Sequence, residues 1–94
     1  MTSWPASSHE EIQGHTRGLL IALAPQLPAI TAGLVDGMID ANECGVAVEI
    51  MSEMLVEAGG VISEETLSEV AFLVKELRLD PINVERLRSR VEEL

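Results

Sequence analysis

The chain has 94 residues, 47% of them hydrophobic, and a formal net charge of −10 at pH 7. This length fits one domain with a modest core. The acidic balance excludes bare nucleic acid and anionic membrane surfaces as partners, because binding either requires Lys and Arg to neutralise phosphates. A basic protein is the partner that such a charge favours.

The charge is unevenly distributed along the chain. Between Gly18 and Val74 there are nine carboxylates and no lysine or arginine. Three of these carboxylates, Glu49, Glu53 and Glu57, recur every four residues. On a helix, neighbouring like charges at this spacing each cost a few tenths of a kcal/mol, so local stability does not explain them. An electropositive partner would.

The first expected helix runs from Ser8 to about Leu23, after a flexible tail over residues 1–7. Ser8 and Glu11 have the spacing of a capping box, in which each side chain accepts a hydrogen bond from the backbone of the other. The spacing of the apolar residues predicts one buried face, made of Ile12, Leu19, Leu20 and Leu23.

Residues 24–28, which include two prolines, are expected to break the helix. A second helix is expected to follow this break and to end at about Asp40. The apolar run from Leu19 to Val35 is also compatible with a membrane span. Its short length and the prolines in its middle favour two buried helices instead. The side chains expected in the core are Ile30, Leu34, Val35, Met38 and Ile39.

Asn42 is a suitable N-cap for a third helix, which the pair Gly59-Gly60 ends. The core face predicted for this helix consists of Ala47, Ile50, Met51, Met54, Leu55 and Ala58. Opposite lie Gly45, Val46, Glu49, Ser52, Glu53, Val56 and Glu57. Two valines among carboxylates predict a mixed binding patch, although single exposed apolar residues are common and need no function.

Ser63 caps a fourth helix, and the dipeptide Asp80-Pro81 begins a short fifth one. On the fourth helix Phe72 falls opposite the apolar face, near Glu65 and Glu69. If exposed, it is an aromatic anchor in a second acidic patch. The alternative, which we favour, buries it under the last or the first helix. The chain is therefore expected to be all-α, a single compact bundle of four to five short helices over residues 8–94.

No residue set predicts catalysis, a cofactor or a metal site. Asp40, Asn42 and Gly45 fit the start of a calcium loop, but Met51 stands where the bidentate glutamate is needed. His9 and His15 do not share a helical face closely enough to ligate zinc and are expected to be solvated. Because no catalytic signature accompanies the many carboxylates, we expect no enzyme activity.

One stretch resembles a known family. Its first part is the run from Gly37 through Asp40, Asn42, Glu43, Gly45 and Ala47 to Glu49. The pattern continues with Leu55, Glu57, the turn 58–62, the helix start Ser63-Glu64-Glu65, the run 73–77 and Leu79. Over about residues 34–80 this resembles the small immunity proteins of bacterial polymorphic toxin systems, the MafI and CdiI-like group. The departures are Cys44, where the family often has an aromatic, and Met51 and Met54 in the third helix.

The resemblance implies a cytoplasmic protein that binds and blocks a cognate toxin domain, often a nuclease. A nuclease cleft is electropositive, so an acidic surface can occupy it without chemistry of its own. The residues expected at the interface are Glu49, Glu53 and Glu57, Val46 and Val56, and a second patch of Glu65, Glu69 and Phe72. The alternative is an acidic adaptor or structural subunit that homodimerises or joins a permanent complex. The sequence leaves the oligomeric state open.

Overall fold

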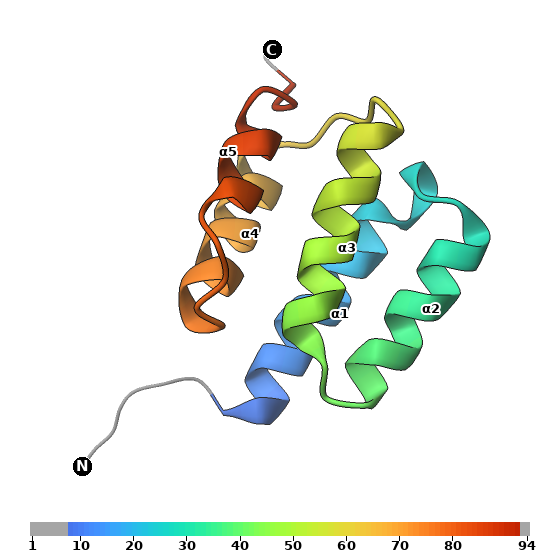
Figure 1. Cartoon of the computed structure of the whole chain (residues 1–94), viewed down its shortest axis with the longest axis vertical. Coiled ribbons are helices and arrows are strands. Elements are labelled where there is room, and N and C mark those ends of the chain that lie inside the picture. Colours follow the sequence, from blue (N-terminus) through green and yellow to red (C-terminus); the bar gives the residue numbers. More distant parts are fainter. Residues whose placement is uncertain (1–7, 93–94) are drawn as a thin grey trace.

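The computed structural model describes residues 8–92, which fold into α-helices joined by short turns (Figure 1). The elements are α1 (His9–Leu23), a 3-10 helix η1 (Ala24–Gln26), α2 (Ala29–Asp40), α3 (Cys44–Glu57), α4 (Glu64–Glu76) and α5 (Ile82–Arg88). The predicted all-α bundle is confirmed. The tail predicted over residues 1–7 lies outside the described residues, as does Leu94.

The helices pack around α1 and α3. Helix α1 contacts α2, α3 and α4, while α3 contacts α2 on one side and α5 on the other. In Figure 1, α3 and α5 lie toward the viewer, α1 and α4 lie behind them, and α2 forms the right-hand edge. No helix among the described residues is long and apolar enough to cross a membrane.

The core is aliphatic. The face predicted for α1 is buried in full, and Met51 and Leu55 of α3 are completely inaccessible to solvent. Val48 and Leu73, which the spacing rules did not assign to the core, are also 0% exposed. Each faces the core because its helix is covered on two sides, α3 by α1 and α5, and α4 by α1 and α5. Coverage on two sides widens the buried face beyond the usual apolar stripe.

Two predictions for α2 are wrong. Ile30 is 84% exposed and Leu34 is 57% exposed, whereas α2 buries Thr31, Val35 and Ile39 against its neighbours. Apolar residues occur on both sides of this helix, so the sequence pattern did not indicate which side faces the core. The inner side is set by the positions of α1 and α3, which only the tertiary structure supplies.

The predicted helix starts are confirmed for α1 and α4. The Ser8 hydroxyl accepts a hydrogen bond from the Glu11 amide at 3.2 Å, and the Ser63 hydroxyl accepts one from the Thr66 amide at 3.1 Å. The N-cap role predicted for Asn42 is wrong. Asn42 has a φ of +63° and terminates α2 instead, its amide donating to the Ile39 carbonyl. This is a Schellman ending, and asparagine tolerates its left-handed conformation better than most residues.

Gly59 and Arg78 end α3 and α4 in the same way, with φ values of +69° and +56°. The Gly60 amide donates to the Leu55 carbonyl at 3.0 Å, and the Leu79 amide donates to the Val74 carbonyl at 2.9 Å. These endings turn the chain sharply without a long loop. They fix where each following helix begins, so they position the surfaces between α3, α4 and α5.

Two sets of interactions fix the loop between α3 and α4: hydrogen bonds from the Gln26 side chain and a backbone bridge at Ile62. The Gln26 side-chain amide donates to the Val61 carbonyl at 2.7 Å and accepts from the Val61 amide at 2.8 Å. The neighbouring Ile62 forms an isolated parallel bridge with Val91 near the end of the described chain. A Cβ at Gly60 would lie 2.5 Å from the buried Leu55 Cδ1 atom and 2.7 Å from the Gln26 Oε1 atom, so any larger residue there would displace its neighbours.

Candidate functional site

The three glutamates spaced four residues apart lie on the outer surface of α3. Glu49, Glu53 and Glu57 are all exposed. Arg86 of α5 approaches Glu53, with 3.9 Å between the guanidinium and carboxylate groups, and both side chains are largely exposed. An exposed pair at this distance contributes little, on the order of 0–1 kcal/mol. The stripe therefore remains acidic, and α5 offsets only its middle member.

A hollow of about 340 Å³ lies beside the stripe, between α3 and α5. Its apolar lining residues are Val46 and Ile82, each 45% exposed, and the half-buried Ile50. The surrounding polar residues are Glu49, Glu53, Asp80, Asn83 and Arg86. This hollow is electronegative, because three carboxylates and only one guanidinium line it, and its exposed apolar side chains can contact a partner. We call it the α3–α5 cleft.

The side of the cleft formed by α5 is fixed by local hydrogen bonds. The Asp80 carboxylate accepts a hydrogen bond from the Ile82 amide at 2.9 Å. The buried Asn83 side chain donates to the Asp80 carbonyl, also at 2.9 Å. The Asp-Pro pair predicted a helix start here with Pro81 as the first helical residue; in the structure Pro81 is the N-cap and α5 begins at Ile82. Ile82 is thus held at the surface on a rigid first turn.

The predicted exposure of Val46 is confirmed, whereas the sequence did not single out Ile82. The opposite face predicted for α3 is partly wrong, because Ser52 is 1% exposed and Val56 is half-buried against the core. Helix α5 covers this side of α3, and the Arg90 guanidinium reaches the Val56 carbonyl at 3.5 Å. Only Val46, Glu49 and Glu53 of the predicted first patch line the cleft. Glu57 is exposed on the last turn, outside it.

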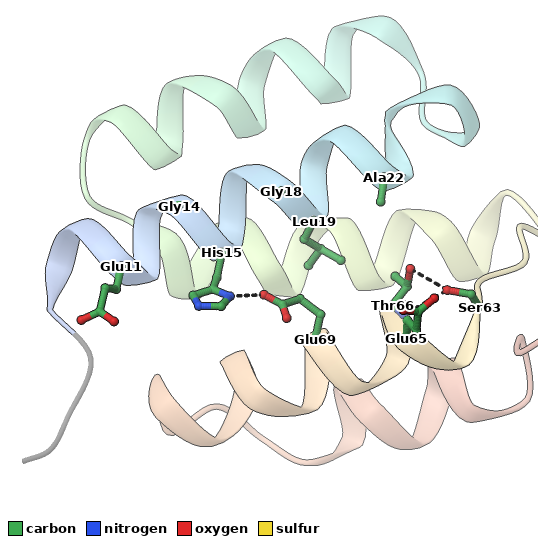
Figure 2. Close-up of a pocket in the computed structure, with 10 residues that line it drawn as sticks. All are labelled: Glu11, Gly14, His15, Gly18, Leu19, Ala22, Ser63, Glu65, Thr66 and Glu69. Carbon is green, nitrogen blue, oxygen red and sulfur yellow. Dashed lines mark hydrogen bonds and ion pairs between the residues drawn. The ribbon is translucent and has the colours of Figure 1, made fainter.

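Glu65 and Glu69 of the second predicted patch line a separate groove of about 580 Å³ between α1 and α4. Figure 2 shows Glu65 and Glu69 reaching into it from α4, with Glu11 on α1 at the far end. Its floor on α1 is formed by Gly14, Gly18, Leu19 and Ala22. This groove is larger than the α3–α5 cleft, but it offers only small or buried apolar side chains. It is acidic, and its exposed apolar side chain is the small Ala22, with no large aliphatic side chain exposed in it.

His15 is exposed to solvent, as predicted, and also reaches across this groove from α1 toward α4. Its ring forms a hydrogen bond with the Glu69 carboxylate, drawn as a dashed line in Figure 2. Phe72 is half-buried, with its ring centroid 4.8 Å from that of His15. Phe72 therefore packs against the first helix, the arrangement that we favoured, and it does not line the groove. His9 is engaged as well, by the Asn42 side chain at 2.8 Å.

Arg17 of α1 offsets the charge of α2. Its guanidinium forms an ion pair with Asp36 and a second one with Asp40, the latter at 2.7 Å. The hydrogen bond to Asp36 is the main cause that raises the pKa of Arg17 above its ordinary value. Two of the nine carboxylates counted in the sequence are thereby paired within the fold. The excess negative charge remains on α3, α4 and the turn before α5.

Cys44 is buried at the start of α3. Among residues 8–92, no three His, Cys, Asp or Glu side chains gather closely enough to hold a metal ion. The described surface carries carboxylates, a few exposed aliphatic side chains and several hollows. Val46 and Ile82 meet the carboxylates only in the α3–α5 cleft.

No protein-family model matches the chain, and comparison with curated proteins and with solved structures gave no match either.

Proposed function

We propose that this chain acts by binding, and that the α3–α5 cleft receives a basic protein. The observation that carries the proposal is the meeting of Val46 and Ile82, each 45% exposed, with the carboxylates of Glu49, Glu53 and Asp80. Exposed apolar side chains ringed by polar groups are typical of protein interfaces. The negative charge of the carboxylates favours a positively charged partner.

The two kinds of residue would act at different stages of binding. The carboxylates attract a basic surface over several ångströms, which raises the association rate and makes it sensitive to salt. Val46 and Ile82 then exclude water at the centre of the contact, which lengthens the lifetime of the complex. The cleft is rigid on both sides, because α3 is packed on four other helices and the first turn of α5 is hydrogen-bonded. A rigid surface loses little conformational entropy on binding.

The class of partner follows from the resemblance together with the charge. A toxin domain that degrades nucleic acid carries an electropositive cleft, and an acidic inhibitor can cover it by stoichiometric occlusion. We therefore propose an immunity protein that acts in the cytoplasm against a cognate toxin domain such as a nuclease. Such a protein needs no chemistry of its own. The alternative function, an adaptor or structural subunit in a permanent complex, would use the apolar side of α2.

Growth rescue tests the proposal. The C-terminal region of the protein encoded immediately upstream is expressed under tight control, with and without this chain. The expected result is growth arrest that the wild-type chain relieves. Val46→Asp should weaken the rescue, since it places a charge among the apolar lining residues of the cleft. Val61→Asp is the matched control, because Val61 is equally exposed, at 46%, in a loop outside the cleft.

Each outcome decides something. Arrest that this chain does not relieve, or no arrest from a well-expressed upstream fragment, would refute the immunity function. Rescue that Val46→Asp and Val61→Asp weaken equally would retain the function and reject the cleft. To exclude misfolding, both variants are compared with the wild type by far-UV circular dichroism and thermal melting.

A further inference from the structure

The outer side of α2 carries an apolar stripe that no described helix covers. Ile30 and Leu34 are 84% and 57% exposed, and they are followed on the same side by Gly37 and by the C-cap residue Ala41. The spacing of the four is 4, 3 and 4 residues. That is the spacing of the a and d positions of a coiled coil, which form one seam along a helix. Figure 1 shows α2 at the edge of the molecule.

We infer that this seam binds a second copy of the chain, with the two α2 helices antiparallel about a two-fold axis. The order of side-chain sizes along the seam supports this occupant: two large residues, Ile30 and Leu34, precede two small ones, Gly37 and Ala41. In an antiparallel pair, Leu34 of one copy lies over Gly37 of the other, and Ile30 lies over Ala41. Each large side chain then meets a small one, so the seam is complementary to itself.

Charge also favours a second copy over other partners at this surface. The chain has no charged residue from Gly18 to Val35, although its formal net charge is −10. The nearest carboxylates on α2, Asp36 and Asp40, are already paired with Arg17 of α1. Two such acidic molecules repel one another least when they meet across an uncharged face. The seam offers that face, and it offers nothing that would attract a basic partner.

The expected dimer is weak. Helix α2 has 12 residues and is therefore about 18 Å long, which places a single seam at the lower end of interface sizes, below roughly 1,200 Å². A dissociation constant between micromolar and millimolar follows. Salt should strengthen the dimer, since it screens the repulsion between two negative molecules. Binding of a basic protein in the α3–α5 cleft should respond to salt in the opposite direction, so the two interactions are separable.

Sedimentation equilibrium tests the inference. The wild-type chain is examined from about 10 µM to 1 mM, at about 0.05 M and 0.5 M NaCl. The expected average mass rises with concentration from 10.2 kDa toward twice that value, and rises further at the higher salt. A mass that stays at the monomer value under every condition overturns the inference, whichever other partner the seam then has.

Substitutions test the geometry. Ile30→Glu should weaken self-association at least tenfold. Ile21→Glu is the matched control: Ile21 is 71% exposed on α1 and off the seam, so the same change of charge should alter the affinity less than twofold. Equal losses in the two variants would contradict the seam. Since both positions are exposed, neither change should prevent folding.

Gly37→Leu separates the seam from general stickiness. A side chain at Gly37 meets nothing within 4 Å in the monomer, so the variant should fold at least as stably as the wild type. In the dimer, the new leucine would occupy the place of the partner's Leu34 side chain, and the affinity should fall at least tenfold. Non-specific apolar association would instead become stronger with an added leucine. That result would refute the antiparallel register.

Discussion

Replacing Ser52 by alanine should stabilise the protein. Ser52 lies inside α3, is 1% exposed, and its hydroxyl has no hydrogen-bond partner among the described residues. A buried hydroxyl left without a partner costs about 1–3 kcal/mol relative to a satisfied one. Alanine also has a higher helix propensity than serine, by about 0.5 kcal/mol. The Ser52→Ala variant should therefore gain about 1–3 kcal/mol after a small loss of packing.

The control is Ser68→Ala. Ser68 occupies the middle of α4 but is exposed, so this change includes the propensity term and excludes the burial term. It should gain only about 0.5 kcal/mol. In a domain of this size, 1 kcal/mol shifts the midpoint of thermal unfolding by about 4–8 °C. Ser52→Ala should thus raise the midpoint by at least about 4 °C and by clearly more than Ser68→Ala.

Urea unfolding followed by far-UV circular dichroism measures the same difference as a free energy. If Ser52→Ala gains no more than Ser68→Ala, the Ser52 hydroxyl is satisfied in solution and the burial argument fails. A loss of stability would mean that the hydroxyl makes a hydrogen bond that α3 depends on. The backbone carbonyl four residues earlier, on Val48, is the acceptor that a helical serine commonly uses.

Gly60→Ala should destabilise the protein by about 1–3 kcal/mol, because the new Cβ would lie 2.5 Å from Leu55 Cδ1. Gly14→Ala should instead stabilise the protein by about 1 kcal/mol, because a Cβ at Gly14 would meet nothing within 4 Å. Urea unfolding that gave both changes the same sign would contradict this packing. Arg78→Gly should stabilise by about 0.5–1 kcal/mol, because Arg78 holds a φ of +56° at the end of α4; an unchanged thermal midpoint would mean that the Arg78 side chain compensates for its strained backbone. Arg17→Gln should lower the thermal midpoint at low salt and lower it less at about 0.5 M NaCl, because it removes two exposed ion pairs. Arg88→Gln, which removes a single looser pair with Glu85, should have the smaller effect, and a loss independent of salt would rule out an ionic origin.

The sequence predicted features that depend on near neighbours. Ser8 and Ser63 cap their helices through amides three residues away, so their role is visible in a short stretch of sequence. The fold class follows from the same local signals, repeated along the chain. The predicted exposure of Val46, Glu49 and Glu53 held because α5 contacts α3 beside them and leaves them uncovered.

The predictions that failed depend on how helices pack. Asn42 was assigned as the N-cap of α3, but it ends α2 in the left-handed conformation. Asparagine is favoured in both roles, so its identity alone does not distinguish them. Ser52 and Val56 were placed on an exposed face, and α5 covers that side of α3. Ile82 joins the cleft from a helix 32 residues beyond Ile50. Contacts across such distances in sequence leave no periodic signal that a single chain would reveal.

The central claim, that the α3–α5 cleft binds a basic partner, is tested most directly by association kinetics. Glu49 lines the cleft and forms no ion pair within residues 8–92, whereas Glu57 is an exposed glutamate on the same helix outside the cleft. Two unit charges about 10 Å apart in water interact by about 0.4 kcal/mol, so reversing one changes this by about 0.8 kcal/mol.

With the purified upstream toxin fragment as partner, Glu49→Lys should therefore associate about threefold to fourfold more slowly at low salt, and the difference should vanish near 0.5 M NaCl. Glu57→Lys should slow association less. Equal rates for the wild type and Glu49→Lys at low salt, or no binding by the wild type, would contradict the account.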